Sequence, residues 1–437
     1  MESELEMDRR EFGLLSLGTA AAATTGIPIS LAPANAQDTN VPRSIAQLPP
    51  DLRGLMTRSF AKFSDAEYAR REQLMTRIMG EANVDYVLLV TWQRIGSTTE
   101  WLTGWPGWTE ANTVYKPGER MTTFVEYYNH IPLAQRMVRN SDVQWAEDRG
   151  TARAIEELKR RGAKRVGVIG PLLVPRYRQL EAAFPTVSLD REYTNLRIYE
   201  KSEEEIAWFR IGCALSDAAM STLVKEAKPG MTENELANLV ERGYVPHGGS
   251  HIIHFIGSTS MAKPEVYVPL QFHSQRRLAA GDVVFCELSS AFWGYSGQVL
   301  RSFTIEAEPT QLYRDLHATA ESVFDSITKV IRPGTTVEEM MEQTALVEKN
   351  GFTTCDDVVH GYGGGYFQPI IGSKSRPAAN QPKVTLRENM CMVVQPNVIT
   401  TDKTAGVQTG EMIRVTKTGF ESLHTTPRGL LRSGQLI

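Results

Sequence analysis

The sequence has few cysteines, no basic run and, after residue 36, no long apolar run. Its four cysteines lie far apart and form no C-x-x-C pair, which argues against a zinc ribbon or a dithiol redox site. No segment after residue 36 approaches the roughly 20 apolar residues of a membrane-spanning helix. Without a basic run there is little to bind a phosphate backbone. We therefore expect neither nucleic acid nor a membrane as a partner of the protein after residue 36. We also expect Cys213, Cys286 and Cys391 to be core thiols.

The first 36 residues have a different composition. Arg9 and Arg10 precede an apolar stretch that ends in the small-x-small sequence Ala34-Asn35-Ala36. This pattern predicts a twin-arginine export signal over residues 1–36 and a periplasmic mature protein that begins near Gln37. A terminal tail with a chance arginine pair is the alternative. Removal of the signal leaves 45 basic and 46 acidic residues, a formal charge of −1.

Two parts follow the signal and a loose lead-in over residues 37–60. Residues 61–196 carry the apolar runs VDYVLLV and KRVGVIG, with a helical pattern before the second run. Runs of this length predict buried strands, so we expect an α/β domain. Residues 200–437 change to long helical patterns and then long strand patterns, which predict a separate domain.

The second part contains a repeated unit. Pro229-Gly230 precedes the capping box Thr232-x-x-Glu235, and the same P-G-x-T-x-x-E pattern recurs 104 residues later, from Pro333 to Glu339. Each copy follows an apolar helical segment, and a capping box begins a new helix. The repetition favours an internal duplication, with helices and antiparallel strands in each half.

Between the two copies, residues 285–305 have the pattern of a β-hairpin. Glu287 and Gln298 lie at equal distances from the point between Phe292 and Trp293. If the chain turns there, the two side chains face each other across an antiparallel pair and share one face of the sheet. Such a pair suits a ligand-binding site, and a solvated polar pair is the alternative.

Several motifs are combined in an order that is specific to one family. They are KSEEEIAWFR, the two P-G-x-T-x-x-E units, GDVVFCELSSAFWGYSGQVLRSF, HGYGGGY, LRENMCMVVQPNV and GVQTGEMIRVTKTGFESLH. Over residues 60–430 the chain resembles the creatinase/prolidase/methionine aminopeptidase family. The resemblance implies an α/β N-terminal domain, an α+β pita-bread C-terminal domain with pseudo-two-fold internal duplication, and a homodimer.

Metal-dependent members of that family carry five liganding residues. Carried over, their two hairpin aspartates fall on Glu287 and Gln298, their histidine on His360, and their two glutamates on Gln395 and Gly410. Three of these positions have lost their acid, and neutral amides neutralise no cation charge. We therefore expect no metal and no other cofactor. A single metal on Glu287, His360 and Glu411 is the alternative.

A histidine beside a carboxylate then provides the acid–base chemistry. The candidates are His360 and His273 as proton carriers, with Glu287 and Glu411 as partners. Strict spacing puts Leu270 where creatinase-like members have a general-base histidine, and His273 is the nearest substitute. The expected substrate-binding residues are Gln298, Gln395, Tyr295, Tyr366, Trp92, Trp105, Trp108 and Arg301.

The tryptophans suggest what kind of ligand binds. Four of the seven tryptophans lie within residues 92–108, where Gly104, Pro106 and Gly107 indicate a loop. Such a group predicts stacking on a flat or cationic ligand. A dimer interface explains the same composition.

The sequence leaves several functions open. The leading hypothesis is a metal-independent enzyme that hydrolyses a carbon–nitrogen bond in a small non-peptide molecule, with aromatic compounds among the candidates. A lyase that cleaves a carbon–carbon or carbon–heteroatom bond by elimination is the second. An Xaa-Pro-type peptidase and a non-catalytic binding protein are further alternatives.

Overall fold

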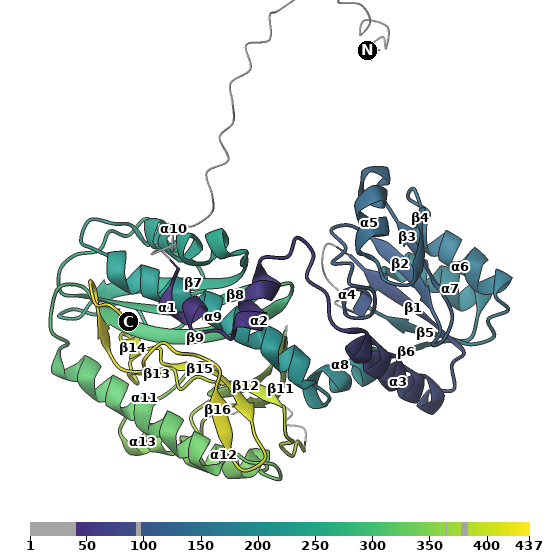
Figure 1. The fold of residues 1–437 in the computed structure, drawn as a ribbon. Helices are drawn as coiled ribbons and strands as arrows, with labels where there is room; N and C mark the ends of the chain where they lie inside the picture. Colours follow the sequence, from purple (N-terminus) through teal and green to yellow (C-terminus); the bar gives the residue numbers. More distant parts are fainter. Residues whose placement is uncertain (1–40, 93–97, 364, 377–382) are drawn as a thin grey trace, which may run out of the picture. The chain divides into compact units, whose positions relative to one another are not determined.

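A computed structural model of the chain describes residues 41–92, 98–363, 365–376 and 383–437 (Figure 1). The expected export signal lies outside these residues, so twin-arginine export and a periplasmic location stay predictions. Within the described ranges, no helix has both the length and the apolar character needed to cross a membrane.

The N-terminal part is built on a mixed six-stranded sheet with the order β4-β3-β2-β1-β5-β6. The apolar runs expected as strands form β1 and β5, which pair in parallel, while β1 is antiparallel to β2. The strands are β1 (Tyr86–Thr91), β2 (Ala111–Tyr115), β3 (Met121–Val125), β4 (Ser141–Trp145), β5 (Val166–Ile169) and β6 (Thr186–Ser188). The helices are α3 (Asp65–Glu81), α4 (Thr98–Thr103), η1 (Tyr128–His130), α5 (Ile131–Met137), α6 (Gly150–Arg160), α7 (Val174–Ala183) and α8 (Asp190–Tyr199). This confirms the α/β class.

The segment before this sheet is not a loose lead-in. This segment contains α1 (Arg43–Ala46) and α2 (Pro50–Met56). Ile45 of α1, Leu52 of α2 and Leu48 between them are buried in the same hydrophobic cluster as helix α9 of the C-terminal part. The expectation failed because proline-initiated helices this short give little periodic signal in the sequence.

The C-terminal part is built on a second, nine-stranded sheet. Its main order is β11-β10-β12-β15-β9-β8-β7, with β16 beside β15 and β17 beside β9. The strands are β7 (Ser250–Ser260), β8 (Asp282–Phe292), β9 (Tyr295–Thr304), β10 (Val359–Tyr362), β11 (Tyr366–Ile371), β12 (Cys391–Val394), β15 (Gly410–Val415), β16 (Phe420–Ser422) and β17 (Leu431–Arg432). A separate two-stranded ribbon joins β13 (Val398–Ile399) to β14 (Gly406–Val407).

Two sets of helices pack on this sheet (Figure 1). The first set shares a core with β8 and β9, and the second shares a core with β10, β12 and β15. The first set is α9 (Glu203–Glu226) and α10 (Glu233–Tyr244), which is followed by the short η2 (Val245–His247) with no buried residue. The second set is α11 (Gln311–Val330), α12 (Val337–Thr344) and α13 (Leu346–Lys349). The C-terminal part is the α+β pita-bread fold.

The internal duplication is visible in the geometry of the two P-G-x-T-x-x-E units. Thr232 and Thr336 both form complete capping boxes with the glutamate three residues later. The amides of Gly230 and Gly334, both at positive φ, donate to Leu278 O and Leu386 O at 2.8 and 2.9 Å. The two halves therefore use the same turn to attach a helix to a later segment of the chain.

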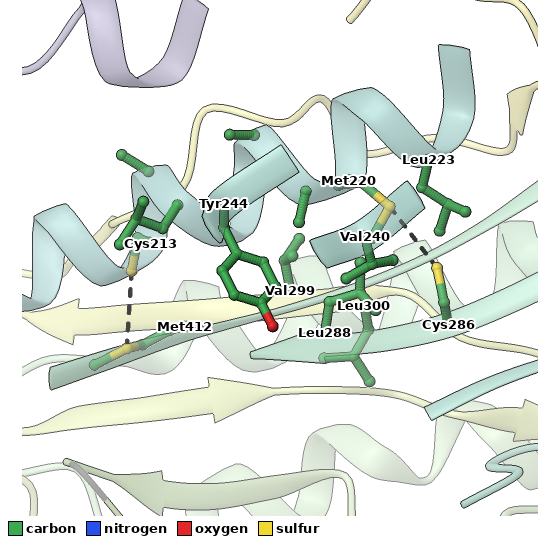
Figure 2. Packing of buried hydrophobic residues seen from close by; sticks show 14 of the residues in the cluster. Cys213, Met220, Leu223, Val240, Tyr244, Cys286, Leu288, Val299, Leu300 and Met412 are labelled. Atoms are coloured by element: carbon green, nitrogen blue, oxygen red, sulfur yellow. Dashed lines mark hydrogen bonds between the residues drawn. The ribbon is translucent and has the colours of Figure 1, made fainter. Parts of the chain in front are cut away.

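Helix α9 lies against the β8–β9 hairpin through an apolar and sulfur-rich contact (Figure 2). The Cys213 Sγ lies 4.0 Å from the Met412 Sδ, and the Cys286 Sγ lies 3.7 Å from the Met220 Sδ. All four cysteines are free, and Cys213, Cys286 and Cys391 are buried. The expectation of core thiols is confirmed.

Two glycines set the distance between α9 and strand β9. A Cβ on Gly212 would lie 2.3 Å from Tyr295 O, and a Cβ on Gly297 would lie 2.4 Å from the Cys213 Cα. Both obstacles are backbone atoms, which cannot move aside as a flexible side chain can. The close approach places β9, and with it the residues of the hairpin, at a fixed depth beneath α9.

This packing predicts opposite effects for two helical glycine substitutions. Gly212→Ala should lower the free energy of unfolding by about 1–3 kcal/mol, the usual cost of overpacking. Gly80→Ala in α3 is the matched control, because a Cβ there meets nothing within 4 Å, and it should be neutral or stabilising by up to about 1 kcal/mol. Urea denaturation measures both, and equal stability of the two variants would contradict the proposed packing constraint.

Candidate active site

The hairpin turns one residue later than the sequence suggested. Phe292 pairs with Tyr295, so the turn is Trp293-Gly294, with φ of 46° and 80°. A two-residue turn with positive φ at both central residues matches the twist of the two strands of a hairpin. Glu287 is therefore opposite Leu300, while Gln298 is opposite Ser289. The two candidates are diagonal neighbours on one face rather than directly opposed.

Diagonal placement still brings Glu287 and Gln298 into contact. The Gln298 Nε2 donates to the Glu287 Oε1 at 2.5 Å, and the Nε2 of Gln408, between β14 and β15, donates to the Oε2 at 3.2 Å. Both carboxyl oxygens thus accept from an amide. All three side chains are buried.

Gln395, which follows β12, extends these contacts to His360 and Asp356. Its Oε1 accepts from the Gln298 Nε2 at 3.2 Å and lies 3.3 Å from the His360 Nε2. Its Nε2 donates to the Asp356 Oδ2 at 3.3 Å, and the Asn397 Nδ2 donates to the same oxygen at 2.9 Å. We call the connected set the amide–carboxyl network: Glu287, Gln298, Asp356, His360, Gln395, Asn397 and Gln408.

The two carboxyl groups of the network, those of Glu287 and Asp356, have raised pKa values. Burial, followed by the negative charges of Asp356 and Asp357, raises the pKa of Glu287 to about 8, against a smaller opposing effect of the Gln408 amide. Burial and then Asp357 raise the pKa of Asp356 to about 6. Near neutral pH, Glu287 is therefore mostly protonated and Asp356 mostly ionised.

His360 is in the network, as predicted, but is mainly neutral. Burial lowers the pKa of His360 to about 4, although the Gly361 carbonyl, Asp356 and Gln395 act in the opposite direction. The ring nitrogens lie 3.1 Å from Gly361 O and 3.3 Å from the Gln395 Oε1. A neutral imidazole has one N–H and can donate to only one of these oxygens. At neutral pH the carboxyls are better placed than His360 to exchange protons.

Glu411 and Arg301 lie outside the network, contrary to the prediction. The Arg301 Nη2 donates to the Glu411 Oε2 at 2.6 Å, and this ion pair is buried. The Nη2 also donates to the Thr426 carbonyl, and the other Arg301 nitrogens donate to carbonyls of Leu300, Gly410 and Pro427. All the N–H groups of Arg301 are thus engaged in hydrogen bonds. Arg301 links three chain segments, and its positive charge compensates that of Glu411.

His273 also lies outside the network, contrary to the prediction. Its ring is exposed, and the Nδ1 contacts the Asn234 side chain on α10. Leu270, at the position given by strict spacing, lies within 3.0 Å of a Cβ built on Gly257, as does Phe285. Phe285 lies on the same face of β8 as Glu287. Leu270, at the position where the resemblance implies a histidine, therefore lies near this face.

Of the aromatic candidates, Tyr366 is the one that adjoins the network. Its ring stacks on His360 with centroids 4.2 Å apart and an interplanar angle of 23°. Tyr295 instead joins Glu205 and Arg71 at 2.9 and 3.1 Å. It lines a cavity of about 290 Å³ on the α9 side of the hairpin, together with Phe63, Trp101, Trp208 and Trp293. This cavity contains none of the network residues.

The clustered tryptophans do not form one wall. Trp105 is buried in the core between β3 and α5, Trp108 is 66% exposed, and Trp92 lies 5.6 Å from the Arg176 guanidinium. Within the described contacts, none of the three touches the network.

Sequence reasoning missed four residues of the site: Asp356, Asp357, Asn397 and Gln408. Asp356 and Asp357 lie only four and three residues before His360, and acids so close to a candidate histidine were a usable signal. Asn397 and Gln408 had none, because the β13–β14 ribbon that brings them together leaves only a weak pattern.

The comparisons with known proteins agree with this geometry. The sequence pattern described as metallopeptidase family M24 matches residues 207–417. Residues 207–417 belong to metallopeptidase family M24. An uncharacterized hydrolase/peptidase of Sinorhizobium fredii is 23% identical over 411 residues, covering 84% of this chain and 98% of that protein. A Xaa-Pro dipeptidase of Pyrococcus horikoshii is 23% identical over 247 residues, covering 53% of this chain and 64% of that protein.

Solved structures extend the likeness to both parts of the chain. The prolidase from Pyrococcus horikoshii OT3 has a TM-score of 0.70 at 20% identity, covering 83% of this chain and 100% of that chain. The X-Pro aminopeptidase from Thermotoga maritima MSB8 has a TM-score of 0.71 at 18% identity, covering 83% and 99%. These matches show the M24 fold, and the relatives are hydrolases and peptidases.

The residues present do not fit the metal centre that the M24 name implies. Glu287 retains a carboxyl, but each of its oxygens accepts an amide N–H, a contact that competes with metal coordination. Gly410, at φ 142°, has no room for a side chain, because a Cβ would lie 2.2 Å from Val394 O. Within the described ranges, no cluster of three or more His, Cys, Asp or Glu residues is arranged to hold a metal ion.

The raised pKa of Glu287 predicts that the free energy of unfolding depends on pH. The folded pKa of Glu287 lies above its ordinary value, so its contribution is present at low pH and is lost as pH rises towards about 8. Between pH 6 and 8, wild type should lose about 2–3 kcal/mol of unfolding free energy relative to Glu287→Gln. Urea unfolding across this range measures the difference.

The exposed residue Glu308, paired with Arg432 at the surface, supplies the control for this series. Glu308→Gln should run parallel to wild type across the same pH range. Parallel curves for wild type and Glu287→Gln would mean that Glu287 titrates normally.

Proposed function

We propose that this protein is a metal-independent hydrolase that cleaves a carbon–nitrogen bond in a small non-peptide molecule. The observation that carries the proposal is the buried Glu287 carboxyl, held by two amides and sharing its site with the ionisable Asp356. Two carboxyls whose pKa values are set apart by their surroundings are the usual arrangement for an acid and a base in one site.

The roles follow from the protonation states. Asp356 is mostly ionised at neutral pH and serves as the base that takes a proton from water. Glu287 is mostly protonated and serves as the acid that gives a proton to the departing nitrogen. The oxygen of water bonds to carbon as the carbon–nitrogen bond breaks. Gln298 and Gln408 orient Glu287 by hydrogen bonds. Gln395 and Asn397 orient Asp356 in the same way, while neutral His360 contacts Gln395.

Two wider features belong to the same proposal. Export to the periplasm rests on the sequence of residues 1–36, and a homodimer rests on the family resemblance. Trp108 and Tyr128 are 66% and 70% exposed, and an interface with a second copy would cover such rings. Size-exclusion chromatography with light scattering, and fractionation of producing cells, test these two features.

Turnover should not depend on metal. Purified protein, assayed with a panel of small amides, ureas and amidines, should release amine or ammonia equally with and without a chelator. Water labelled with heavy oxygen should place its label in the product. Xaa-Pro dipeptides form the comparison arm, and cleavage of these that stops on chelation would contradict the proposal. An unsaturated product without label would indicate a lyase.

Substitution of the proton donor should abolish most of this activity. Glu287→Gln keeps the shape and removes the proton, so kcat should fall about 10²–10⁴-fold, the usual contribution of a general acid. Glu308→Gln is the matched control at the surface and should retain full activity. If Glu287→Gln retained wild-type kcat, Glu287 could not be the acid.

The pH profile should be bell-shaped. As pH rises through about 6, Asp356 loses its proton and becomes a base, so kcat/KM rises. As pH rises through about 8, Glu287 loses the proton it must donate, so kcat/KM falls. Stopped or continuous assays from pH 5 to 9 measure this, and a profile that rises with a single limb near 4 would point to His360 instead.

A further inference from the structure

The cavity of about 290 Å³ on the α9 side of the hairpin has a largely aromatic wall. Its aromatic lining residues are Phe63, Tyr68, Trp101, Trp208, Trp293 and Tyr295. The exposed side chains of His251 and Ile252 line it as well, so the cavity reaches the surface. Pockets for small molecules occupy roughly 300–1,000 Å³. We call this space the aromatic cavity, and its volume suits a ligand with a single ring.

The rings of the wall lie at different angles to one another. Phe63 and Trp208 are stacked, with centroids 3.9 Å apart and an interplanar angle of 15°. The ring of Tyr295 is tilted against both, with centroid distances of 5.3 Å to Phe63 and 5.5 Å to Trp208. Aromatic pairs prefer offset-stacked or edge-to-face geometry, and a wall of this kind offers both to a bound ring.

The charged residues of the lining are mainly positive. Arg71 and Arg197 line the aromatic cavity, and their exposed fractions are only 0% and 7%. Glu100 is the one acid among the lining residues that the structure describes. Two guanidinium groups therefore face the cavity against a single carboxyl.

The buried acids behind the wall are already used by other arginines. Glu67 accepts from the Arg71 Nε at 2.7 Å and from the Arg70 Nε at 2.8 Å. Glu205 forms ion pairs with Arg70 at 3.0 Å and with Arg71 at 3.4 Å. These two carboxylates thus balance the charges of two guanidinium groups and leave none for Arg197.

Arg197 is bonded to neutral oxygens. Its Nη1 donates to the Tyr193 hydroxyl at 3.2 Å, and its Nη2 donates to Gly363 O at 3.0 Å. The charge of Glu205 acts on Arg197 at longer range, but among the described residues no acid forms an ion pair with it. Arginine is rarely buried without a paired acid. A buried guanidinium of this kind beside a cavity points to an anionic ligand.

We propose that the aromatic cavity binds an aromatic carboxylate, a molecule with one ring and an ionised carboxyl group. The guanidinium group of Arg197 donates to the carboxylate oxygens, a pairing that matches in shape and in charge. The ring of the ligand packs against the aromatic wall. This site is separate from the amide–carboxyl network, and the inference does not rest on the proposed function.

Isothermal titration calorimetry at pH 7 tests the binding with four probes. Benzoate has the ring and the negative charge, benzamide has the ring without charge, acetate has the charge without the ring, and benzylammonium has the ring with the opposite charge. Benzoate should bind at least about tenfold more tightly than each of the others, because hydrogen bonds between charged groups are the stronger ones and the ring adds apolar contact.

Two independent variants assign the binding to the aromatic cavity. Arg197→Gln removes the positive charge and should weaken benzoate binding about tenfold or more. Trp293→Asn removes one ring of the wall and should weaken it about threefold to tenfold. The second variant leaves Asn-Gly at the turn of the hairpin, the sequence that two-residue turns with positive φ prefer, so the hairpin is retained.

Matched controls repeat the two changes at exposed positions. Arg178→Gln, at a side chain that is 78% exposed, and Phe272→Asn, at a residue that is 85% exposed, should bind benzoate as wild type. Glu287→Gln should also bind benzoate as wild type, because Glu287 belongs to the other site. Circular dichroism and thermal melts establish that each variant is folded. If Arg197→Gln does not fold, Trp293→Asn and the four probes still decide the question.

Several results would overturn the inference. Equal binding of benzamide or benzylammonium would show that the negative charge is not recognised, and equal binding of acetate would show that the ring is not. Unchanged benzoate binding in the folded cavity variants, or no binding of benzoate at all, would exclude the aromatic cavity as the site. Loss of benzoate binding in Glu287→Gln would place the ligand in the network instead.

Discussion

The hydrogen bonds from Gln298 and Gln408 to the two oxygens of Glu287 are the constraint on which the site depends. They hold the carboxyl in a buried position, where burial and then the charges of Asp356 and Asp357 favour the neutral acid against a smaller opposing effect of the Gln408 amide. In this arrangement the groups bonded to the carboxyl are the amides of Gln298 and Gln408, and Asp356 adds a second carboxyl from a neighbouring segment.

The fold supports this arrangement from a distance. Gly212 and Gly297 let α9 approach β9 closely, so the hairpin that carries Glu287 and Gln298 cannot shift easily. Arg301 forms an ion pair with Glu411 and links strand β9 to the C-terminal segment. The Glu411 carboxylate is thereby paired with Arg301 and not with the network, whose carboxyl groups are those of Glu287 and Asp356.

Periodicity and capping were sufficient to predict the two-part fold and the repeated P-G-x-T-x-x-E units, because these signals are local. The hairpin pattern placed Glu287 and Gln298 on one face of a strand pair, and the family resemblance, not a local signal, indicated their role and that of His360. The predicted turn of the hairpin was one residue too early, because no local sequence signal indicates that Trp293 adopts a positive φ. His273 and the loop tryptophans failed because the direction of a loop is set by tertiary contacts, such as the contact of His273 with Asn234.

The central claim is that Glu287 carries a proton at neutral pH, and a carbon-13 NMR titration of glutamate side-chain carboxyls tests it most directly. The resonance that disappears in Glu287→Gln identifies the residue. The account predicts that this resonance titrates near pH 8. A titration near the ordinary glutamate value, about 4.3, would contradict it.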